Sequence, residues 1–363
     1  MEELDVTDVF KICSEKEARG IRVINAHIGA PSHLPPIPIS RLLKEIESTG
    51  LKYLPFEGLR VARERISEFA RKFLGREMDP ERIFVTNGGA QALTSTLLAL
   101  RDRKVLLPAP GFTQYFDNAR IMGLRFSTYN STAEDIISEI LSKLGDAGAV
   151  LINYPNNPTG YMPSNDSLYC LWEELKRKGV LLINDAAYSQ IYFDFKPEIP
   201  GDIVIDTFSK TLGIPGLRIG YVYWGIGETR AIFGAVYITS AGVSEISQLV
   251  LSTLLSSLTK EYLENVRQYY KSKRDFIVKL MREYNFSFPE PRGAFYIFAK
   301  HSKIKDANLL ARRLLSREDL VVGIVPGSVF RSDSNYFRIC YSTLTEKDAE
   351  DMVRLIMEEA RLQ

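Results

Sequence analysis

The stretch DIVIDTFSKTLGIPGLRIGYVYW, residues 202–224, joins two apolar runs through a loop of small and hydroxyl-bearing residues. The runs at 202–209 and 218–224 predict β-strands. Similar short apolar runs recur along the middle of the chain, at 82–87, 104–110, 146–155 and 180–188. They alternate with helical stretches such as 168–179, which is typical of an α/β fold with a mainly parallel sheet covered by helices on both faces.

The loop between the two runs contains an unusual lysine. Lys210 lies among Ser, Thr, Gly, Ile and Leu, and such surroundings favour the neutral, nucleophilic form of its amine. Arg218 carries a permanent charge that suits a phosphate, and Thr207 and Ser209 add hydroxyl donors nearby. The loop therefore predicts an activated amine beside an anion site.

The two ends of the chain differ from this middle part. Residues 1–45 include the proline-rich stretch APSHLPPIPIS, which cannot form a regular helix. From about residue 260 the sequence has helical spacing and many charges, followed by the alternating runs GAFYIFAK and NYFRICYS, which predict strands. We therefore expect a large domain at 46–260, and a smaller α+β domain built from both termini, at 1–45 and 261–363.

The composition narrows the classes of function. With 46 basic and 45 acidic residues, the net charge of +1 gives no electrostatic reason to expect nucleic acid or a membrane as a partner. The N-terminus MEELDVTDVF lacks the basic start and apolar core of a signal peptide. The three cysteines, Cys13, Cys170 and Cys340, have neither metal-binding nor disulfide spacing. We therefore expect a cytoplasmic protein without a metal site.

Four further loops follow predicted strands, where ligands bind in open parallel sheets. Gly89 and Ala90 in TNGGAQAL offer backbone N–H groups to an anion. Phe112 in PGFTQY is placed to stack on a flat ring, and Asn157 in NYPNNPTG projects from a rigid turn with room for cis peptides. Asp185 in INDAAYS is a carboxylate at a strand end, where it needs a cationic partner. Taken singly, each has a plainer reading as a turn, a core aromatic or a helix cap.

Together the five loops carry the parts needed to hold pyridoxal phosphate (PLP), because a lysine Schiff base and an aspartate partner for the ring nitrogen are the expected protein contribution. The chain resembles class I/II aminotransferases of PLP fold type I over nearly its whole length. The motifs NYPNNPTG, DAAY and SKTLGIPGLRIG occur in the order found in that family. The resemblance implies a seven-stranded, mainly parallel sheet sandwiched by helices, with a smaller second domain.

The resemblance also implies a role for each matched residue. Lys210 would form the Schiff base with the cofactor, and Asp185 would pair with its pyridinium nitrogen. Asn157 and Tyr188 would bond the phenolic oxygen, and Phe112 would stack on the ring. The phosphate would be held by the backbone amides of Gly89 and Ala90 and the side chains of Thr207, Ser209 and Arg218.

Three further matches lie outside these loops. Tyr53 in YLPFEGLRVARE would reach the phosphate of the neighbouring subunit, so the resemblance implies a homodimer with shared active sites. Arg338 in NYFRICYS would grip the substrate α-carboxylate as a bidentate pair. Gly29 in IGAP, together with Asn157, would lie beside the substrate.

The predicted function is transfer of an amino group from an amino acid to a 2-keto acid by a ping-pong mechanism. Lys210, Asp185 and Tyr188 would be catalytic, and Lys210 would move the proton at the substrate Cα. A PLP-dependent decarboxylase or lyase, for example one acting on a phosphorylated amino acid, would use the same motifs and stays open. The presence of Lys210 disfavours a non-catalytic regulatory domain. A nicotinamide or nucleotide enzyme is disfavoured because neither GxGxxG nor GxxxxGKS/T follows a strand.

The substrate stays open because the motifs conflict. NYPNNPTG with AYSQIYFD resembles aspartate- or diaminopimelate-type members, whereas PGFTQY and the short chain resemble histidinol-phosphate-type members. Four side chains are candidates to face a distal carboxylate or phosphate of the substrate: Arg22, Tyr188, Arg292 and Arg331.

Overall fold

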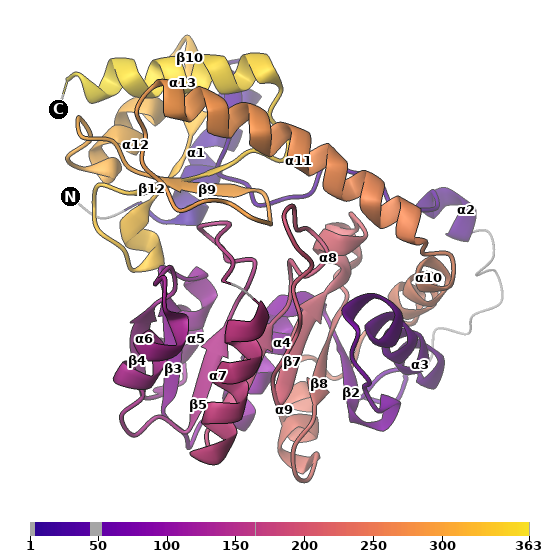
Figure 1. Cartoon of the computed structure of the whole chain (residues 1–363). Coiled ribbons are helices and arrows are strands. Elements are labelled where there is room, and N and C mark those ends of the chain that lie inside the picture. Colours follow the sequence, from indigo (N-terminus) through magenta and orange to yellow (C-terminus); the bar gives the residue numbers. More distant parts are fainter. Residues whose placement is uncertain (1–3, 44–52, 164, 363) are drawn as a thin grey trace.

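The computed structural model describes residues 4–43, 53–163 and 165–362 (Figure 1). Its largest sheet has seven strands in the order β2-β8-β7-β6-β5-β3-β4. They are β2 (Ile83–Thr86), β8 (Gly220–Trp224), β7 (Ile203–Thr207), β6 (Leu181–Asp185), β5 (Ala149–Ile152), β3 (Val105–Ala109) and β4 (Phe126–Asn130). β8 is antiparallel to both of its neighbours, and the other paired strands are parallel. The predicted α/β fold with a mainly parallel sheet is therefore confirmed.

The structure differs from the strand predictions at two places: the edge strand β4 was not predicted, and β8 starts later than predicted. β4 has the sequence FSTYN, and only its Tyr129 is buried, so it lacks the apolar run that marks the inner strands. β8 begins at Gly220, two residues later than predicted. The reason is that Arg218 takes a left-handed backbone conformation with φ of 50°, which ends the loop before the strand starts.

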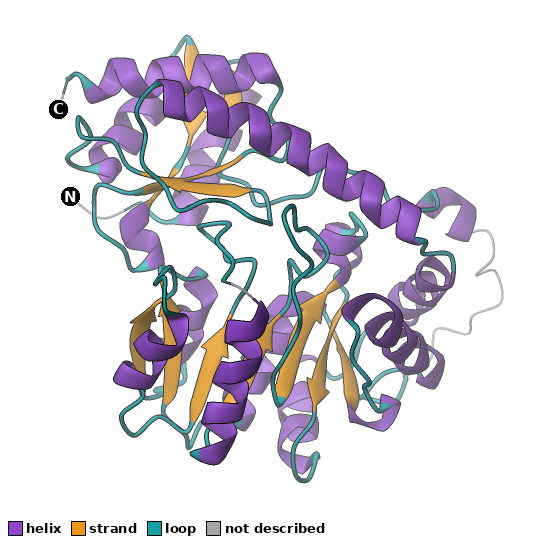
Figure 2. Ribbon diagram, viewed as in Figure 1, coloured by secondary structure: helices purple, strands orange, loops and turns teal. Residues whose placement is uncertain are grey.

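Helices cover both faces of the sheet, as Figure 2 shows. Alternate strand residues point to opposite faces, so Val105 and Leu107 pack in one core and Leu106 in another. The first face packs against α4 (Gly88–Ala99), α5 (Thr113–Ile121) and α9 (Arg230–Ser240). The second packs against α3 (Arg60–Phe69) and α10 (Glu245–Ser256) near β2, and against α6 (Ile136–Lys143) and α7 (Asn165–Arg177) near β5.

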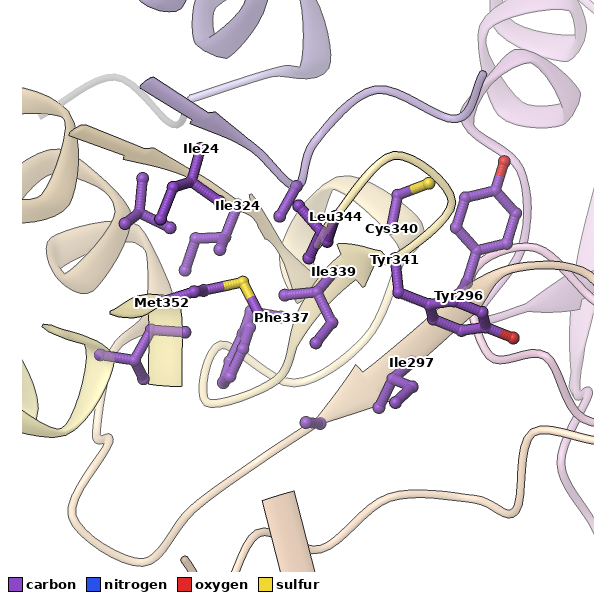
Figure 3. Close-up of a cluster of buried hydrophobic side chains, with 14 of the residues drawn as sticks. Ile24, Tyr296, Ile297, Ile324, Phe337, Ile339, Cys340, Tyr341, Leu344 and Met352 are labelled. Atoms are coloured by element: carbon purple, nitrogen blue, oxygen red, sulfur yellow. The ribbon is translucent and has the colours of Figure 1, made fainter. Parts of the chain in front are cut away.

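The two ends of the chain share a second core, part of which Figure 3 shows. β1 (Arg22–Asn25) pairs in parallel with β10 (Leu320–Gly323). β12 (Phe337–Cys340) lies antiparallel between β11 (Val325–Pro326) and β9 (Tyr296–Ala299). The helices of this part are α1 (Val6–Ala18), α12 (Ala307–Ser316) and α13 (Glu346–Ala360).

The long helix α11 (Lys260–Glu283) runs along the upper part in Figure 1. It contributes to the core around α3 and α10 and to the core of the chain ends. Leu263 near its start packs with the core around α3 and α10, whereas Ile277 and Met281 pack with the core of the chain ends. The domain limits at 45/46 and 260/261 stay a prediction, and the first of them lies outside the described residues. No single helix of the described chain has the length and apolarity to cross a membrane; α9 and α10 pass that test only as a pair, bent by 119°.

Candidate active site

A cavity of about 570 Å³ opens where the carboxyl ends of β6 and β7 meet the segment that follows β1. Apart from Tyr53, it gathers every residue for which the resemblance implies a role, whereas the candidate arginines Arg22, Arg292 and Arg331 are not in its lining. The predicted residues that line it are Gly29, Gly89, Ala90, Phe112, Asn157, Asp185, Tyr188, Thr207, Ser209, Lys210, Arg218 and Arg338. The structure therefore brings together side chains that are up to 309 positions apart in sequence, and their individual roles stay predictions.

Lys210 lies on the short helix α8 (Phe208–Thr211), directly after β7. Its Nζ donates a hydrogen bond of 2.5 Å to the Gly29 carbonyl and lies 5.9 Å from the Phe295 ring. Burial is the main reason that the pKa of Lys210 is lowered to about 8, and the nearby charges of Arg338 and Arg218 contribute to this total. About a tenth of this amine is therefore neutral at pH 7, far more than for an ordinary lysine, and the neutral form is the nucleophile.

A candidate anion site lies at the N-terminus of α4, which also lines the cavity. The first N–H groups of a helix have no intrahelical partner. In α4 the side chain of the N-cap residue Asn87 does not bond them either, so they can face an anion. The Thr207 and Ser209 hydroxyls lie 3.0 Å apart beside this helix end. A Cβ added at Gly88 would lie 2.8 Å from the Arg218 guanidinium, so glycine is needed for the arginine to approach the helix. Backbone donors, hydroxyls and a permanent cation together suit a phosphate.

Asp185 ends β6 and is buried behind the cavity. Its Oδ2 accepts a 2.7 Å hydrogen bond from the Tyr115 hydroxyl, and its Oδ1 accepts one of 3.2 Å from the Ala187 backbone. Asn153 donates to the Asp185 carbonyl. Burial raises the pKa of Asp185, since the described hydrogen-bond donors are neutral. A cation placed in the cavity beside this carboxylate would relieve that cost.

The hydroxyl groups of two tyrosines meet in the wall of the cavity. The hydroxyl groups of Tyr188 and Tyr296 are 2.6 Å apart, and burial raises the pKa of both. A Cβ added at Gly29 would lie 2.2 Å from the Tyr296 hydroxyl oxygen. Glycine is therefore required at position 29 because the chain passes directly over this phenol.

Arg338 lies at the other end of the cavity and is buried. One terminal nitrogen donates to Asn157 Oδ1 at 3.0 Å, and the other donates to the His27 carbonyl at 2.6 Å. Its Nε is buried without a hydrogen-bond partner. Because a buried donor is costly when unpaired, this guanidinium is suited to receive a carboxylate.

The turn NYPNNPTG is built as predicted. The Tyr154–Pro155 and Asn157–Pro158 peptide bonds are cis. The Asn157 backbone N–H donates to Asn153 Oδ1 at 2.9 Å, which fixes the turn beside Asp185. Asn157 thereby connects the Asp185 end of the cavity to Arg338.

Four predicted candidates lie away from the cavity or take another partner. Tyr53 is 100% exposed. Arg22 forms ion pairs with Asp348 and Asp351 on α13. The other two arginines also bind elsewhere: Arg292 donates to the Met162 carbonyl, and Arg331 lies over the Phe116 ring.

Several cavity residues were not predicted. Tyr115, three positions after Phe112 in PGFTQY, lies in the first turn of α5, where a tyrosine is ordinary and gives no sign of a ligand site. Tyr296 belongs to the aromatic run GAFYIFAK, which gave no sign that one ring faces a ligand. The first turns of α1 also line the mouth of the cavity, through Val6, Thr7 and Phe10.

Comparisons with known proteins agree with this site. The sequence profile of the family described as aminotransferase class I and II matches residues 22–356. The chain is 27% identical to an LL-diaminopimelate aminotransferase of Natranaerobius thermophilus, covering 94% of this chain and 92% of that protein. It is 30% identical to an aspartate aminotransferase of Pyrococcus abyssi, covering 94% and 93%.

The fold likewise matches a solved structure. An aspartate aminotransferase from Thermus thermophilus with maleate superposes with a TM-score of 0.87, at 22% identity, over 100% of this chain and 97% of that one. At that identity the likeness concerns the fold. Together, the family profile, the full-length relatives and the cavity show that this chain belongs to the class I and II aminotransferase family and is a transaminase.

Proposed function

We propose that the chain binds pyridoxal 5′-phosphate in this cavity and uses it to transfer an amino group from an amino acid to a 2-keto acid. One observation carries the proposal: the enclosed Lys210 amine, with its pKa lowered to about 8, lies in one cavity with a buried carboxylate, an anion site and a second buried cation. These are the complements of an aldehyde, a ring nitrogen, a phosphate and a substrate carboxylate.

The residues present fit the cofactor at its ring nitrogen and at its phosphate. Asp185 has neutral donors and would gain a cationic partner in a protonated ring nitrogen. The N-terminus of α4 with Arg218 offers donors and positive charge to the phosphate. When bound, pyridoxal phosphate supplies an aldehyde carbon that receives the amino group and a ring that withdraws electrons from the substrate Cα.

The residues of the chain would then divide the remaining tasks. Lys210 Nζ would remove the proton from the Cα of the donor amino acid in one half-reaction and add a proton to the Cα of the product amino acid in the other, because its pKa of about 8 lies close to working pH. The Gly29 carbonyl holds that amine in place. Arg338 fixes the substrate carboxylate, and Asn157 Oδ1 fixes Arg338. The Tyr115 hydroxyl favours the ionised form of Asp185 by donating to it, and so opposes the rise in pKa that burial causes.

We also propose a homodimer. Phe56 contacts two aromatic rings of α9, with centroid distances of 6.3 Å to Phe233 and 4.6 Å to Tyr237. The next residue, Ile238, is 74% exposed, and Tyr53 lies three residues before Phe56. Exposed apolar residues gathered in this way mark an association surface. A second copy covering it would place Tyr53 at an interface, from which it could reach the other subunit's phosphate. Light scattering of Ile238→Asp, expected to be monomeric, tests this association.

The compartment is a further proposal. Each of the three cysteines of the chain is free, which suits a reducing cytoplasm. Fractionation of the source cells tests this assignment, and recovery in a membrane or secreted fraction would contradict it.

The experiment for the main proposal uses the purified protein with added pyridoxal phosphate. We expect a visible absorbance band that Lys210→Ala abolishes, and turnover that requires both an amino acid and a 2-keto acid. An unchanged band in Lys210→Ala would overturn the cofactor assignment. Release of ammonia or carbon dioxide without any need for a keto acid would point to a lyase or decarboxylase instead.

A further inference from the structure

Each cationic side chain in the described lining of the cavity already has a role in the proposed function. Among the described residues that line it, the cationic side chains are Lys210, Arg218 and Arg338. In the proposed function they serve the aldehyde, the phosphate and the substrate α-carboxylate. His27 adds no positive charge, because burial lowers its pKa to about 4. A second carboxylate on the substrate therefore finds no unassigned cation in this part of the chain.

The arginines predicted as candidates for that second carboxylate do not change this balance. Arg22, Arg292 and Arg331 are absent from the described lining of the cavity, and each binds another part of the chain. The remaining acidic residue of the lining, Asp117, lies half-exposed and is ion-paired with Arg120. The described lining within one subunit thus offers no free cation to a second substrate carboxylate.

The surroundings of Arg338 are apolar on the side that leads to the mouth. The Phe330 ring centroid lies 4.9 Å from the Arg338 guanidinium carbon, and Val6 of α1 packs against the cluster that contains Phe330. His27, whose carbonyl binds Arg338, is followed by Ile28 in the cavity wall. The Phe10 ring lies edge-on to His27 at 6.1 Å. A substrate held by Arg338 therefore has an apolar wall beside its Cα.

The first turn of α1 presents apolar atoms to the same opening. Val6, Thr7 and Phe10 line the cavity from adjacent positions on the helix surface. The Thr7 hydroxyl is committed to Asp5 Oδ1 at 2.6 Å. Asp5 also caps the helix by accepting from the Asp8 backbone, so the N-terminus of α1 is already occupied by a carboxylate. Phe10 is 52% exposed, and a substrate side chain would cover it.

We propose that this wall is the side-chain subsite, and that the enzyme prefers amino acids with uncharged apolar or aromatic side chains over dicarboxylic ones. The inference rests on the proposed function and assigns Phe10 as a specificity-determining residue. A second carboxylate that this wall covers without a cationic partner is disfavoured on the order of a hundredfold. An apolar side chain instead gains from covering Phe10, Phe330 and Val6. The N-terminus of α5, with Thr113 and Gln114, is the competing place for an anion, so dicarboxylic donors belong in the test.

The test compares single half-reactions of the PLP-loaded enzyme, which need no keto acid. Phenylalanine, leucine and methionine are each mixed with the enzyme, in parallel with aspartate and glutamate, and the change in cofactor absorbance is followed. We expect the apolar donors to react with at least about 30-fold higher kcat/KM. Equal or faster reaction of aspartate or glutamate overturns the subsite assignment and leaves the transaminase proposal standing. Absence of reaction with every amino acid refutes the proposed function itself.

Binding without turnover gives a second readout. The holoenzyme is titrated calorimetrically with 3-phenylpropionate and with succinate, which carry the two side-chain types but no amine. We expect 3-phenylpropionate to bind at least about tenfold more tightly, and tighter binding of succinate overturns the proposal.

The variant Phe10→Ala tests the assigned residue. It should lower kcat/KM for phenylalanine about 10-fold and leave that for alanine, whose methyl group is too short to need the ring, within about twofold. Tyr284→Ala is the matched control, because Tyr284 is a 40% exposed aromatic residue outside the cavity. An equal loss for both donors in Phe10→Ala, or the same loss in Tyr284→Ala, overturns the role of Phe10.

Discussion

Tyr115→Phe removes one hydroxyl group from the centre of the site without leaving a cavity. Tyr115 is fully buried, and its hydroxyl donates to Asp185 Oδ2 at 2.7 Å. A hydrogen bond to a charged group contributes about 1.5–3 kcal/mol to stability. An unfolding entropy of ~2.1 cal/mol/K per residue gives roughly 0.8 kcal/mol/K for 363 residues. The variant without cofactor should therefore melt roughly 2–4 °C below the parent at pH 7.

The sign of the pH dependence follows from the pKa of Asp185. Burial raises this pKa above its ordinary value of 3.8, so ionised Asp185 lowers the stability of the fold at pH values above its folded pKa. Tyr115 offsets that cost chiefly while the carboxylate is ionised. The difference in Tm between the variant and the parent should be largest near neutral pH. It should shrink as the pH falls through the folded-state pKa of Asp185, because below that pH the carboxyl is protonated in both proteins.

Differential scanning fluorimetry from pH 4 to pH 8, with and without pyridoxal phosphate, measures this effect. The cofactor should reduce the difference, because its ring nitrogen gives Asp185 a new partner. Tyr129→Phe is the control: Tyr129 is also buried, and it donates to the neutral Leu151 carbonyl at 3.0 Å. Its loss should be smaller and independent of pH and cofactor. A Tyr115→Phe shift that equals the Tyr129→Phe shift at every pH would refute the reasoning.

Three other substitutions test single contacts. Arg338→Lys keeps the charge but loses the planar fork, and should raise KM for the amino acid roughly 10- to 150-fold in steady-state assays with little change in melting temperature. Gly29→Ala pushes a methyl group onto the Tyr296 hydroxyl, and should cost about 1–3 kcal/mol in chemical denaturation while also slowing turnover. Tyr270→Phe removes the acceptor of the Ser32 N–H and the partner of His33, and should speed hydrogen exchange at Ser32, whereas Tyr269→Phe, which loses only a 3.1 Å contact to the Ser32 hydroxyl, should not.

The sequence predicted most of the sheet because the inner strands are buried on both faces. β5 and β7 consist of continuous apolar runs with every residue buried, which a window of a few residues detects. β4 escaped detection because an edge strand needs no such run, and its sequence is half polar. The antiparallel direction of β8 depends on the three-dimensional path of the loop at Arg218, which short-range patterns do not encode.

The predicted residues of the cavity are those whose chemistry is unusual for their neighbours. Lys210 and Asp185 stand out because a charged group follows an apolar strand, and that cost points to a ligand. Tyr115 does not stand out, since a tyrosine in the first turn of a helix is ordinary. Its importance comes from a contact with Asp185 across 70 positions of sequence. That contact exists only because β3 and β6 both flank β5 in the sheet.

The least predictable part of the site is the backbone of the N-terminal connector, residues 26–34. Two of its carbonyl groups hold side chains that act on the substrate. The Gly29 carbonyl accepts from the Lys210 amine, and the His27 carbonyl accepts from the Arg338 guanidinium. Every residue has a carbonyl, so the sequence placed Gly29 beside the substrate but gave no sign that these two carbonyls bind Lys210 and Arg338. Two hydrogen bonds fix the connector, one before and one after His27 and Gly29. The Cys340 N–H donates to the Ala26 carbonyl, and the Ser342 hydroxyl donates to the Ala30 carbonyl. The spacing of this segment, rather than most of its side chains, is therefore what places the amine near the substrate Cα and the guanidinium near the carboxylate attached to it.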